Sequence, residues 1–247
     1  MNDIAVSIKN VKKFFKLPHE KEDSLKFRVI NIFKPKNKGH SEYKALNGIT
    51  IDIKKGEFIG ILGRNGAGKS TLLKIIAEIY QPTSGTITVN GKLVPFIELG
   101  VGFNPNLSGR DNVYLNGAML GFTRSELDEM YDSIVDFAEL HDFMDQKLKN
   151  YSSGMQVRLA FSVAIKANAD ILLLDEVLAV GDASFQRKCY DYFDSLKQHN
   201  KTIIFVTHNM GAVRQYCTRA VLIEKGKVAI DGSPDEVANA YDNLFRA

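Results

Sequence analysis

Two segments in the first part of the chain alternate apolar and polar residues, as strands with one buried face do. The alternation covers residues 4–8 and residues 48–53, and it predicts a half-buried strand in each. Residues 57–62 instead form a short apolar run after a Lys-Gly turn, which indicates a strand buried on both faces. Residues 71–77 follow with a pattern that predicts a helix.

The rest of the chain mixes further strand patterns with helical ones. Residues 86–90 and 93–97 indicate two strands on either side of an Asn-Gly turn. A capping box of Thr123 and Glu126 precedes apolar positions at helical spacing and predicts the start of a helix. Strand patterns then return at residues 171–174, 202–207, 220–224 and 228–230. Because helical stretches separate several of these strands, we expect a parallel α/β sheet.

A glycine-rich segment lies between the buried strand and its helix. It has the GxxxxGK[ST] spacing of a phosphate-binding P-loop, and its residues are Gly63, Arg64, Asn65, Gly66, Ala67, Gly68, Lys69, Ser70 and Thr71. Glycines let successive backbone N–H groups point at phosphate oxygens, and the helix adds its positive end. Lys69 would place a charge at the β- and γ-phosphates, and Ser70 a hydroxyl on Mg²⁺. We therefore predict a site for the phosphates of a nucleotide and for Mg²⁺.

Composition bears on the size of the core and on the cellular compartment of the protein. The 247 residues are 45% hydrophobic, which is ample for a sizeable core. Cys189 and Cys217 lie far apart without a partner motif, which suits a reducing compartment. We find no N-terminal signal and no apolar run near the ~18 residues of a membrane span. We expect a soluble, cytoplasmic protein that reaches any membrane through a partner.

The segment between the first two strands, residues 16–43, differs from the rest of the chain. Residues 1–44 hold eleven Lys or Arg and five Asp or Glu, a net charge of +6 against +3 for the whole chain. Residues 25–33 are apolar and basic, and their apolar side chains at one helical face are Leu25, Val29, Ile32 and Phe33. Two interpretations stay open: a surface helix at a membrane boundary or partner, and a small insertion packed on its own domain.

Two polar features follow the P-loop along the chain. The apolar run at 171–174 ends in Asp175 and Glu176, and such a strand delivers its acids to the sheet edge where α/β proteins bind ligands. The first acid would hold Mg²⁺, and the second would polarise a water molecule for attack on the γ-phosphate. Upstream, Ser152 and Gly154 begin a helix whose N-terminus suits a phosphate.

In this order and spacing the motifs resemble the ATP-binding-cassette (ABC) family. Its LSGGQ signature lies just upstream of the Asp-Glu strand, and this chain has a degenerate copy that keeps Ser152 and Gly154. The resemblance implies an α/β fold: a P-loop NTPase (RecA-like) core with an N-terminal antiparallel β subdomain and a small helical subdomain. We expect a single domain over 1–247, divided into 1–98 with 165–247 for the β subdomain and core, 99–164 for the helical subdomain, and 16–43 for an insertion.

The resemblance also implies a mechanism in which two copies face each other head to tail. Each ATP lies on the P-loop of one copy and is capped in trans by Ser152 and Gly154 of the other. The further roles implied are catalysis by Glu176, His208 and Lys69, Mg²⁺ binding by Ser70 and Asp175, adenine stacking by Phe15 with Phe14 as its rival, and a dimer contact by Asp182.

Residues 96–112 point to one kind of cassette. They lack the glutamine usual at this place, and whether Glu98 replaces it, also as a metal ligand, stays open. The run resembles that of exporters of lipid-linked polysaccharide, the O-antigen and teichoic-acid transporters. This implies an ATPase subunit at the cytoplasmic face of the inner membrane, with an integral membrane permease that handles the lipid-linked glycan. Some members carry a C-terminal carbohydrate-binding domain, which we expect to be absent here.

Two other classes of protein are alternatives to an exporter. A soluble ABC ATPase acting on DNA or ribosomes would suit the basic arm, but it usually carries a long coiled-coil insertion or two cassettes. Here 82 residues separate Lys69 from Tyr151, and there is one cassette, so we expect no nucleic-acid partner. A catalytically dead module is disfavoured because the chain retains Lys69, Asp175, Glu176 and His208.

Overall fold

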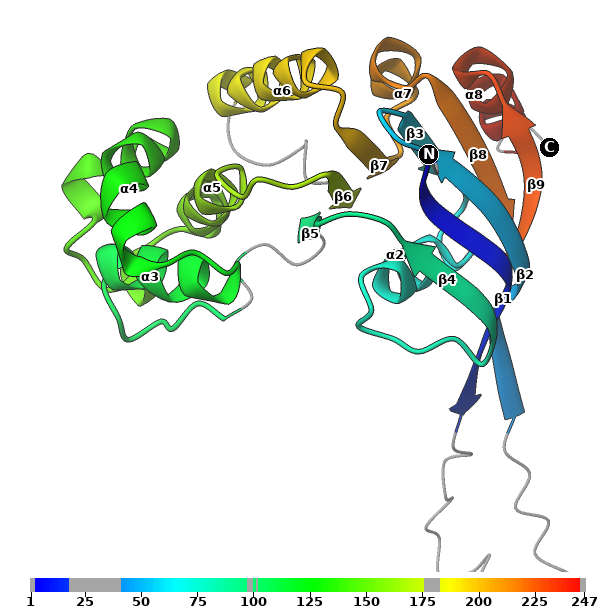
Figure 1. Ribbon diagram of the computed structural model, residues 1–247, viewed down its shortest axis with the longest axis horizontal. Coiled ribbons are helices and arrows are strands. Elements are labelled where there is room, and N and C mark those ends of the chain that lie inside the picture. The colour runs from blue at the N-terminus through cyan, green and yellow to red at the C-terminus, as the bar shows by residue number, and fades with distance from the viewer. Residues whose placement is uncertain (1–2, 18–40, 97–99, 101, 176–182, 245–247) are drawn as a thin grey trace, which may run out of the picture.

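The computed structural model describes residues 3–17, 41–96, 100, 102–175 and 183–244. Within them, two β-sheets pack against each other, and a group of helices stands at one end, away from the first sheet (Figure 1). Residues 25–33, for which a surface helix is one of the two open interpretations, lie outside the described residues. Of the helices that are described, none has the length and apolar character needed to cross a membrane.

The first sheet is antiparallel, with β1 (Ile4–Leu17) between β2 (Ser41–Lys54) and β4 (Ser84–Val89). The alternating strands predicted near the N-terminus are confirmed, and both are longer than their patterns. The pairing of β1 with β2 continues to Leu17 opposite Ser41. The two strand ends that flank the intervening segment are therefore neighbours.

The second sheet has the strand order β5-β6-β7-β3-β8-β9. Its strands are β5 (Leu93–Phe96), β6 (Ile171–Asp175), β7 (Thr202–Val206), β3 (Phe58–Leu62), β8 (Arg219–Glu224) and β9 (Lys227–Gly232). All neighbours are parallel except β9, which runs antiparallel to β8. The predicted parallel sheet is thus confirmed, with an antiparallel strand at one edge.

The central strands are apolar on both sides because each face of this sheet is covered. On β7, Ile203 and Phe205 face one core, whereas Ile204 and Val206 face the other. Helices α6 (Ala183–Gln198), α7 (Met210–Tyr216) and α8 (Pro234–Asn243) cover one face, and α2 (Lys69–Ile76) with the antiparallel sheet covers the other (Figure 1). This double burial explains the continuous apolar runs in the sequence.

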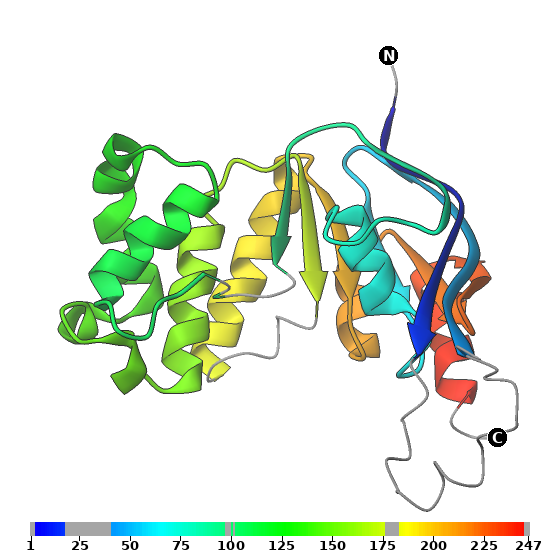
Figure 2. The same ribbon diagram turned by 90° about the horizontal axis from the view of Figure 1, so that it is seen from below.

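The helices at the end of the molecule pack around a core of their own (Figure 2). They are α3 (Gly109–Met119), α4 (Arg124–Ala138) and α5 (Ser153–Ala164), with the short helices η1 (His141–Phe143) and η2 (Leu148–Asn150). The predicted capping box is confirmed at the start of α4. There Thr123 Oγ1 accepts from the Glu126 N–H at 3.3 Å, and the Glu126 carboxylate accepts from the Thr123 N–H at 2.7 Å.

The two strands predicted around the Asn-Gly turn exist, but they do not pair with each other. β4 joins the antiparallel sheet and β5 joins the parallel one. At the crossing, the Asn90 N–H donates to the carbonyl of Ala5, and the Lys92 N–H donates to the carboxylate of Asp170 at 2.8 Å. Residues 90–92 therefore connect the two layers.

Candidate functional site

The P-loop follows β3, a strand buried along its whole length between β7 and β8. Two of its glycines are required by their surroundings. Gly63 and Gly68 have φ of +154° and +110°, and a Cβ added to them would lie 2.4 Å from the carbonyl oxygen of Ile223 and 2.5 Å from that of Ala45. Any side chain here would collide with backbone, so the loop can close against β2 and β8 only with glycine.

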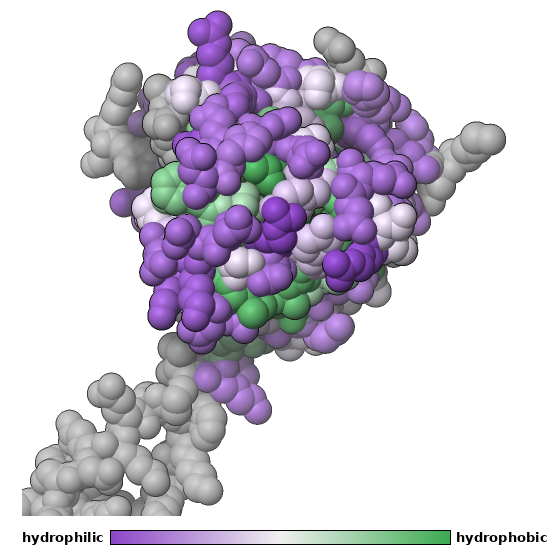
Figure 3. Space-filling view, turned by 90° about the vertical axis from the view of Figure 1, so that its left-hand side faces the viewer, coloured by the Kyte–Doolittle hydropathy of each residue, from purple (hydrophilic) through white to green (hydrophobic). Residues whose placement is uncertain are grey.

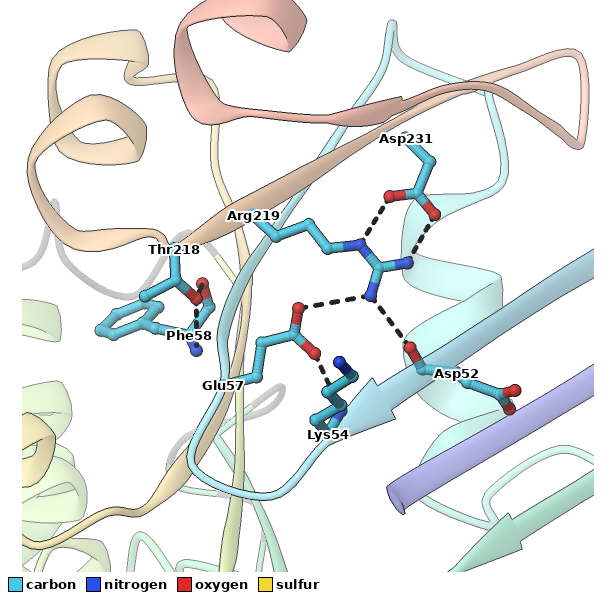
Figure 4. A network of polar contacts seen from close by, with 7 residues as sticks. All are labelled: Asp52, Lys54, Glu57, Phe58, Thr218, Arg219 and Asp231. Carbon is cyan, nitrogen blue, oxygen red and sulfur yellow. Dashed lines mark hydrogen bonds and ion pairs between the residues drawn. The ribbon is translucent and has the colours of Figure 1, made fainter. Parts of the chain in front are cut away.

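A polar network fixes the opposite end of the P-loop strand (Figure 4). Arg219, at the start of β8, donates two hydrogen bonds to the carboxylate of Asp231 on β9, at 2.6 and 2.5 Å. Its Nη1 also donates to the carbonyl of Asp52 at 3.0 Å and to Glu57 Oε1 at 3.3 Å. Glu57 in turn accepts from the Lys54 N–H at 2.8 Å. One guanidinium thus joins β2, β8 and β9 to the residue that precedes β3.

Lys69 holds its charge inside the loop. Lys69 is 6% exposed, and its Nζ donates to the carbonyls of Gly63 at 2.7 Å and Arg64 at 3.3 Å. Helix α2 begins here with Gly68 as N-cap, without a side-chain cap and without an acid in the first turn. The N-terminus of α2 and the ammonium group of Lys69 therefore both place positive charge at the P-loop, an arrangement that favours phosphate binding.

One cavity of about 430 Å³ gathers eight of the predicted site residues. The residues that line it are Tyr43, Asn65, Gly66, Gly68, Lys69, Ser70, Thr71, Asp175 and His208. The sheet order explains why residues far apart in sequence meet here. Asp175 ends β6 and pairs in register with Val206 of β7, and His208 lies two residues after the end of β7. Parallel strands present their carboxyl ends at one edge, and the P-loop leaves β3 at that same edge.

The donor set of this cavity fits a nucleoside triphosphate with Mg²⁺. The cradle of backbone N–H groups, the P-loop ammonium and the helix end suit the phosphates. Ser70 and Asp175 both line the cavity, and they suit Mg²⁺, which takes one or two protein ligands and completes its shell with phosphate and water. The described residues hold no group of three or more His, Cys, Asp or Glu that could bind a metal ion.

An aromatic residue that sequence reasoning missed lies at this cavity. Tyr43, near the start of β2, lines it and donates from Oη to the carbonyl of Gly66 at 3.1 Å. Phe15, the residue expected to stack on adenine, pairs with Tyr43 in the β-ladder but does not line the cavity. Its ring packs edge-on against Tyr80, with centroids 5.7 Å apart. The rival Phe14 lies under the ammonium of Lys44.

The remaining predicted residues divide into two groups. Ser152 caps α5, where its side chain accepts from the Met155 N–H at 3.2 Å, and neither it nor Gly154 lines the cavity. Their role toward a second copy stays a prediction. The others, Glu98, Glu176 and Asp182, lie outside the described residues, so their positions stay predictions.

Comparisons with known proteins place this chain in a family. The sequence profile of the ABC transporter family matches residues 46–179, which is more than half of the chain. AbcA, an ABC transporter protein of Aeromonas salmonicida, is 49% identical over 82% of this chain, and the chain spans 66% of its length. The O-antigen export ATP-binding protein RfbB of Klebsiella pneumoniae is 41% identical over 96% of this chain and 97% of its own length.

Two further matches agree with this picture. TagH of Listeria monocytogenes, named as a teichoic acids export ATP-binding protein, is 38% identical over 99% of this chain and 71% of its own length. A dimeric ATP-binding cassette solved with ADP and Pi has a TM-score of 0.74 over 93% of this chain and 98% of that chain; at 24% identity this likeness shows the fold alone. With its P-loop core and these relatives, the chain belongs to the ABC transporter family.

Proposed function

We propose that this chain is the ATP-hydrolysing subunit of an exporter of lipid-linked polysaccharide, such as O-antigen or teichoic acid, and that it drives a separate membrane permease. The observation that carries the ATPase role is the single cavity that joins the P-loop to Asp175 and His208. The substrate class is supported by the names of the relatives, which are similar over nearly the whole chain.

Within the cavity we assign each described residue a part in holding ATP. The N–H groups of the P-loop and Lys69 bind the phosphates, while Ser70 and Asp175 hold Mg²⁺, which when bound neutralises phosphate charge. Tyr43 stacks on adenine in place of Phe15, because it lines the cavity and its hydroxyl donates to the carbonyl of Gly66. The other P-loop residues serve through their backbone.

Two residues act on the reacting phosphate. Glu176 comes directly after Asp175 on the chain and orients the attacking water, as a carboxylate next to a metal-bound phosphate can. His208 donates to the γ-phosphate and stabilises the charge that develops as the phosphoryl group transfers. We also assign Glu98 to this site, as a further ligand of Mg²⁺.

The capped, two-copy arrangement has support from Gly154. Gly154 is the second residue of α5, and glycine is a weaker helix former than alanine. Yet a Cβ added at Gly154 would meet only Ser152 Oγ, at 3.8 Å, so the packing of this copy does not require glycine. A surface kept without a side chain at a helix N-terminus suits close approach by the phosphates bound to a second copy. Asp182 is proposed as a dimer contact in the same assembly.

We place the permease contact on the helical part of the molecule, residues 99–164. There Leu115 and Met119 of α3 are 36% and 59% exposed, and half-buried Phe103 lies in the preceding loop. Figure 3 looks onto this end and shows an apolar area low on an otherwise mostly hydrophilic face, on the side where α3 runs in Figure 1. Such a partner would hold the chain at the cytoplasmic face of the inner membrane, with residues 1–98 and 165–247 carrying the ATP site.

The test combines hydrolysis, binding and co-purification. We expect Mg²⁺-dependent ATPase activity that is lost in Lys69→Ala through loss of ATP binding. Glu176→Gln should keep ATP binding, slow hydrolysis at least about 100-fold and leave an ATP-bound dimer visible by size-exclusion chromatography. Glu224→Gln, at the end of β8 and outside the cavity, is the matched control. Wild-type hydrolysis by Glu176→Gln would show that the water-orienting residue is another one, and co-purification with ribosomes or DNA instead of a membrane protein would favour the alternative class.

A further inference from the structure

His208 is fixed by an element that the ATP site does not otherwise use. Its Nδ1 lies 2.8 Å from the hydroxyl oxygen of Tyr241, which stands on α8, 33 positions later in the chain. Tyr241 is 7% exposed and belongs to the core that covers the outer face of the parallel sheet. The two ring centroids lie 6.2 Å apart, so this contact runs through the hydroxyl rather than through stacked rings.

The backbone on either side of His208 is held as well. Thr207 is buried, and its Oγ1 accepts from the Asn209 N–H at 3.0 Å. The Asn209 side chain caps α7 by accepting from the Ala212 N–H at 3.1 Å. These bonds fix the Cα of His208 at the end of β7. They leave the rotation of the imidazole about its side-chain bonds to be decided by what its ring nitrogens contact.

The chemistry of the ring gives the Tyr241 contact a direction. A neutral imidazole has one N–H donor and one acceptor nitrogen, and a phosphate oxygen accepts. For Nε2 of the neutral ring to donate to a γ-phosphate, Nδ1 must be the acceptor, so the Tyr241 hydroxyl has to donate to it. The opposite tautomer would turn the lone pair of Nε2 toward the phosphate, which is repulsive.

We propose that Tyr241 is a positioning residue for His208: its hydroxyl donates to Nδ1, sets the Nε2–H tautomer and aims that donor into the ATP cavity. The inference rests on the proposed ATPase function. α8 suits the task because it packs against β3, which carries the P-loop, and against β8 and α7. The donor is thereby held on the same rigid body as the phosphate cradle, which electrostatic stabilisation of a transition state requires.

The kinetic test is Tyr241→Phe, which removes one hydroxyl and keeps the ring in the core. We expect kcat for ATP hydrolysis to fall about three- to tenfold, the range that one hydrogen bond is worth, with KM for ATP within about twofold. Tyr192→Phe is the matched control, since it also loses a hydroxyl hydrogen bond, to the Ile165 carbonyl at 3.1 Å, in the same core. In a His208→Gln background, Tyr241→Phe should have no further effect on kcat. Equal losses in both Tyr variants, or a loss that persists without the imidazole, would assign Tyr241 a structural role only.

A second measurement needs no turnover. ¹⁵N NMR of histidine-labelled protein at about pH 9, where an ordinary imidazole is neutral, reports which ring nitrogen of His208 carries the proton. We expect the Nε2–H form in wild type and a mixture of tautomers in Tyr241→Phe, with and without ATP analogue and Mg²⁺. A wild-type protein with the Nδ1–H form overturns the proposal, whether or not the variant folds. A wild type that has the expected tautomer but no ATPase activity would instead refute the proposed function.

Discussion

The Arg219 network makes a quantitative prediction about what holds the P-loop strand in place. We consider Arg219→Met, which keeps a long side chain but removes the guanidinium. Asp231, 32% exposed, can regain water, whereas the Glu57 side chain is 11% exposed and would keep a charge with its guanidinium partner gone. The pKa of Arg219 is raised by its hydrogen bonds to Asp231 and its proximity to Glu57, so the guanidinium is charged at every pH where the protein folds.

The expected cost lies between two measured classes of ion pair. Breaking a buried pair costs roughly 3–5 kcal/mol and losing an exposed pair roughly 0–1 kcal/mol. Arg219 is 27% exposed, so we expect the free energy of unfolding to fall by about 2 kcal/mol. For a chain of this length this corresponds to a melting temperature lower by about 4–8 °C. Arg219→Lys should lower the free energy of unfolding by less, because lysine keeps the positive charge. It should still be less stable than wild type, because lysine cannot make the bidentate contact with Asp231.

Urea unfolding followed by circular dichroism measures this difference. Arg214→Met is the control, since Arg214 makes ion pairs at 3.3 and 3.7 Å with Asp235 and Asp242 but on an open surface, where we expect a loss under about 1 kcal/mol. The reasoning fails if Arg219→Met unfolds within about 0.5 kcal/mol of wild type, or if the two arginine variants lose equal stability.

Three further predictions address the ATP site, acid stability and the insertion. Tyr43→Ala should weaken ATP binding about tenfold in a calorimetric titration, while Phe15→Ala should change it less than about threefold; the reverse order would restore Phe15 as the stacking residue. The pKa of Glu139 is lowered by its hydrogen bond to Lys188, so its stabilising effect is present above the ordinary glutamate pKa and is lost as pH falls through the lowered pKa of the folded protein. Because 43% of its side chain is exposed, Glu139→Gln should cost under about 1 kcal/mol near pH 7, and urea titrations should show this difference shrinking as pH falls below the ordinary glutamate pKa. Deleting residues 21–38 should spare ATP binding but weaken co-purification with the permease and its stimulation of ATPase activity, and unchanged coupled transport would exclude a docking role.

The sequence by itself determined the features that depend on local spacing. The P-loop, the alternating strands and the Thr123 capping box could be predicted, because each is written within a few consecutive residues whose backbone geometry follows from their types. The order of the motifs also indicated the family and its fold class. For the same reason Asp175 could be assigned to the carboxyl end of a buried strand before its neighbours were known.

Only the tertiary structure decided which of these residues share a site. Strand order brings β6, β7 and β3 together although they are far apart in sequence, and the same order sends β4 and β5 to different sheets. Tyr43 rather than Phe15 borders the cavity because of how the β1–β2 ladder lies against the P-loop, and Tyr241 reaches His208 because α8 folds back over the sheet. Contacts of this kind depend on how whole helices and strands pack together, and the spacing of residues along the chain does not predict that packing.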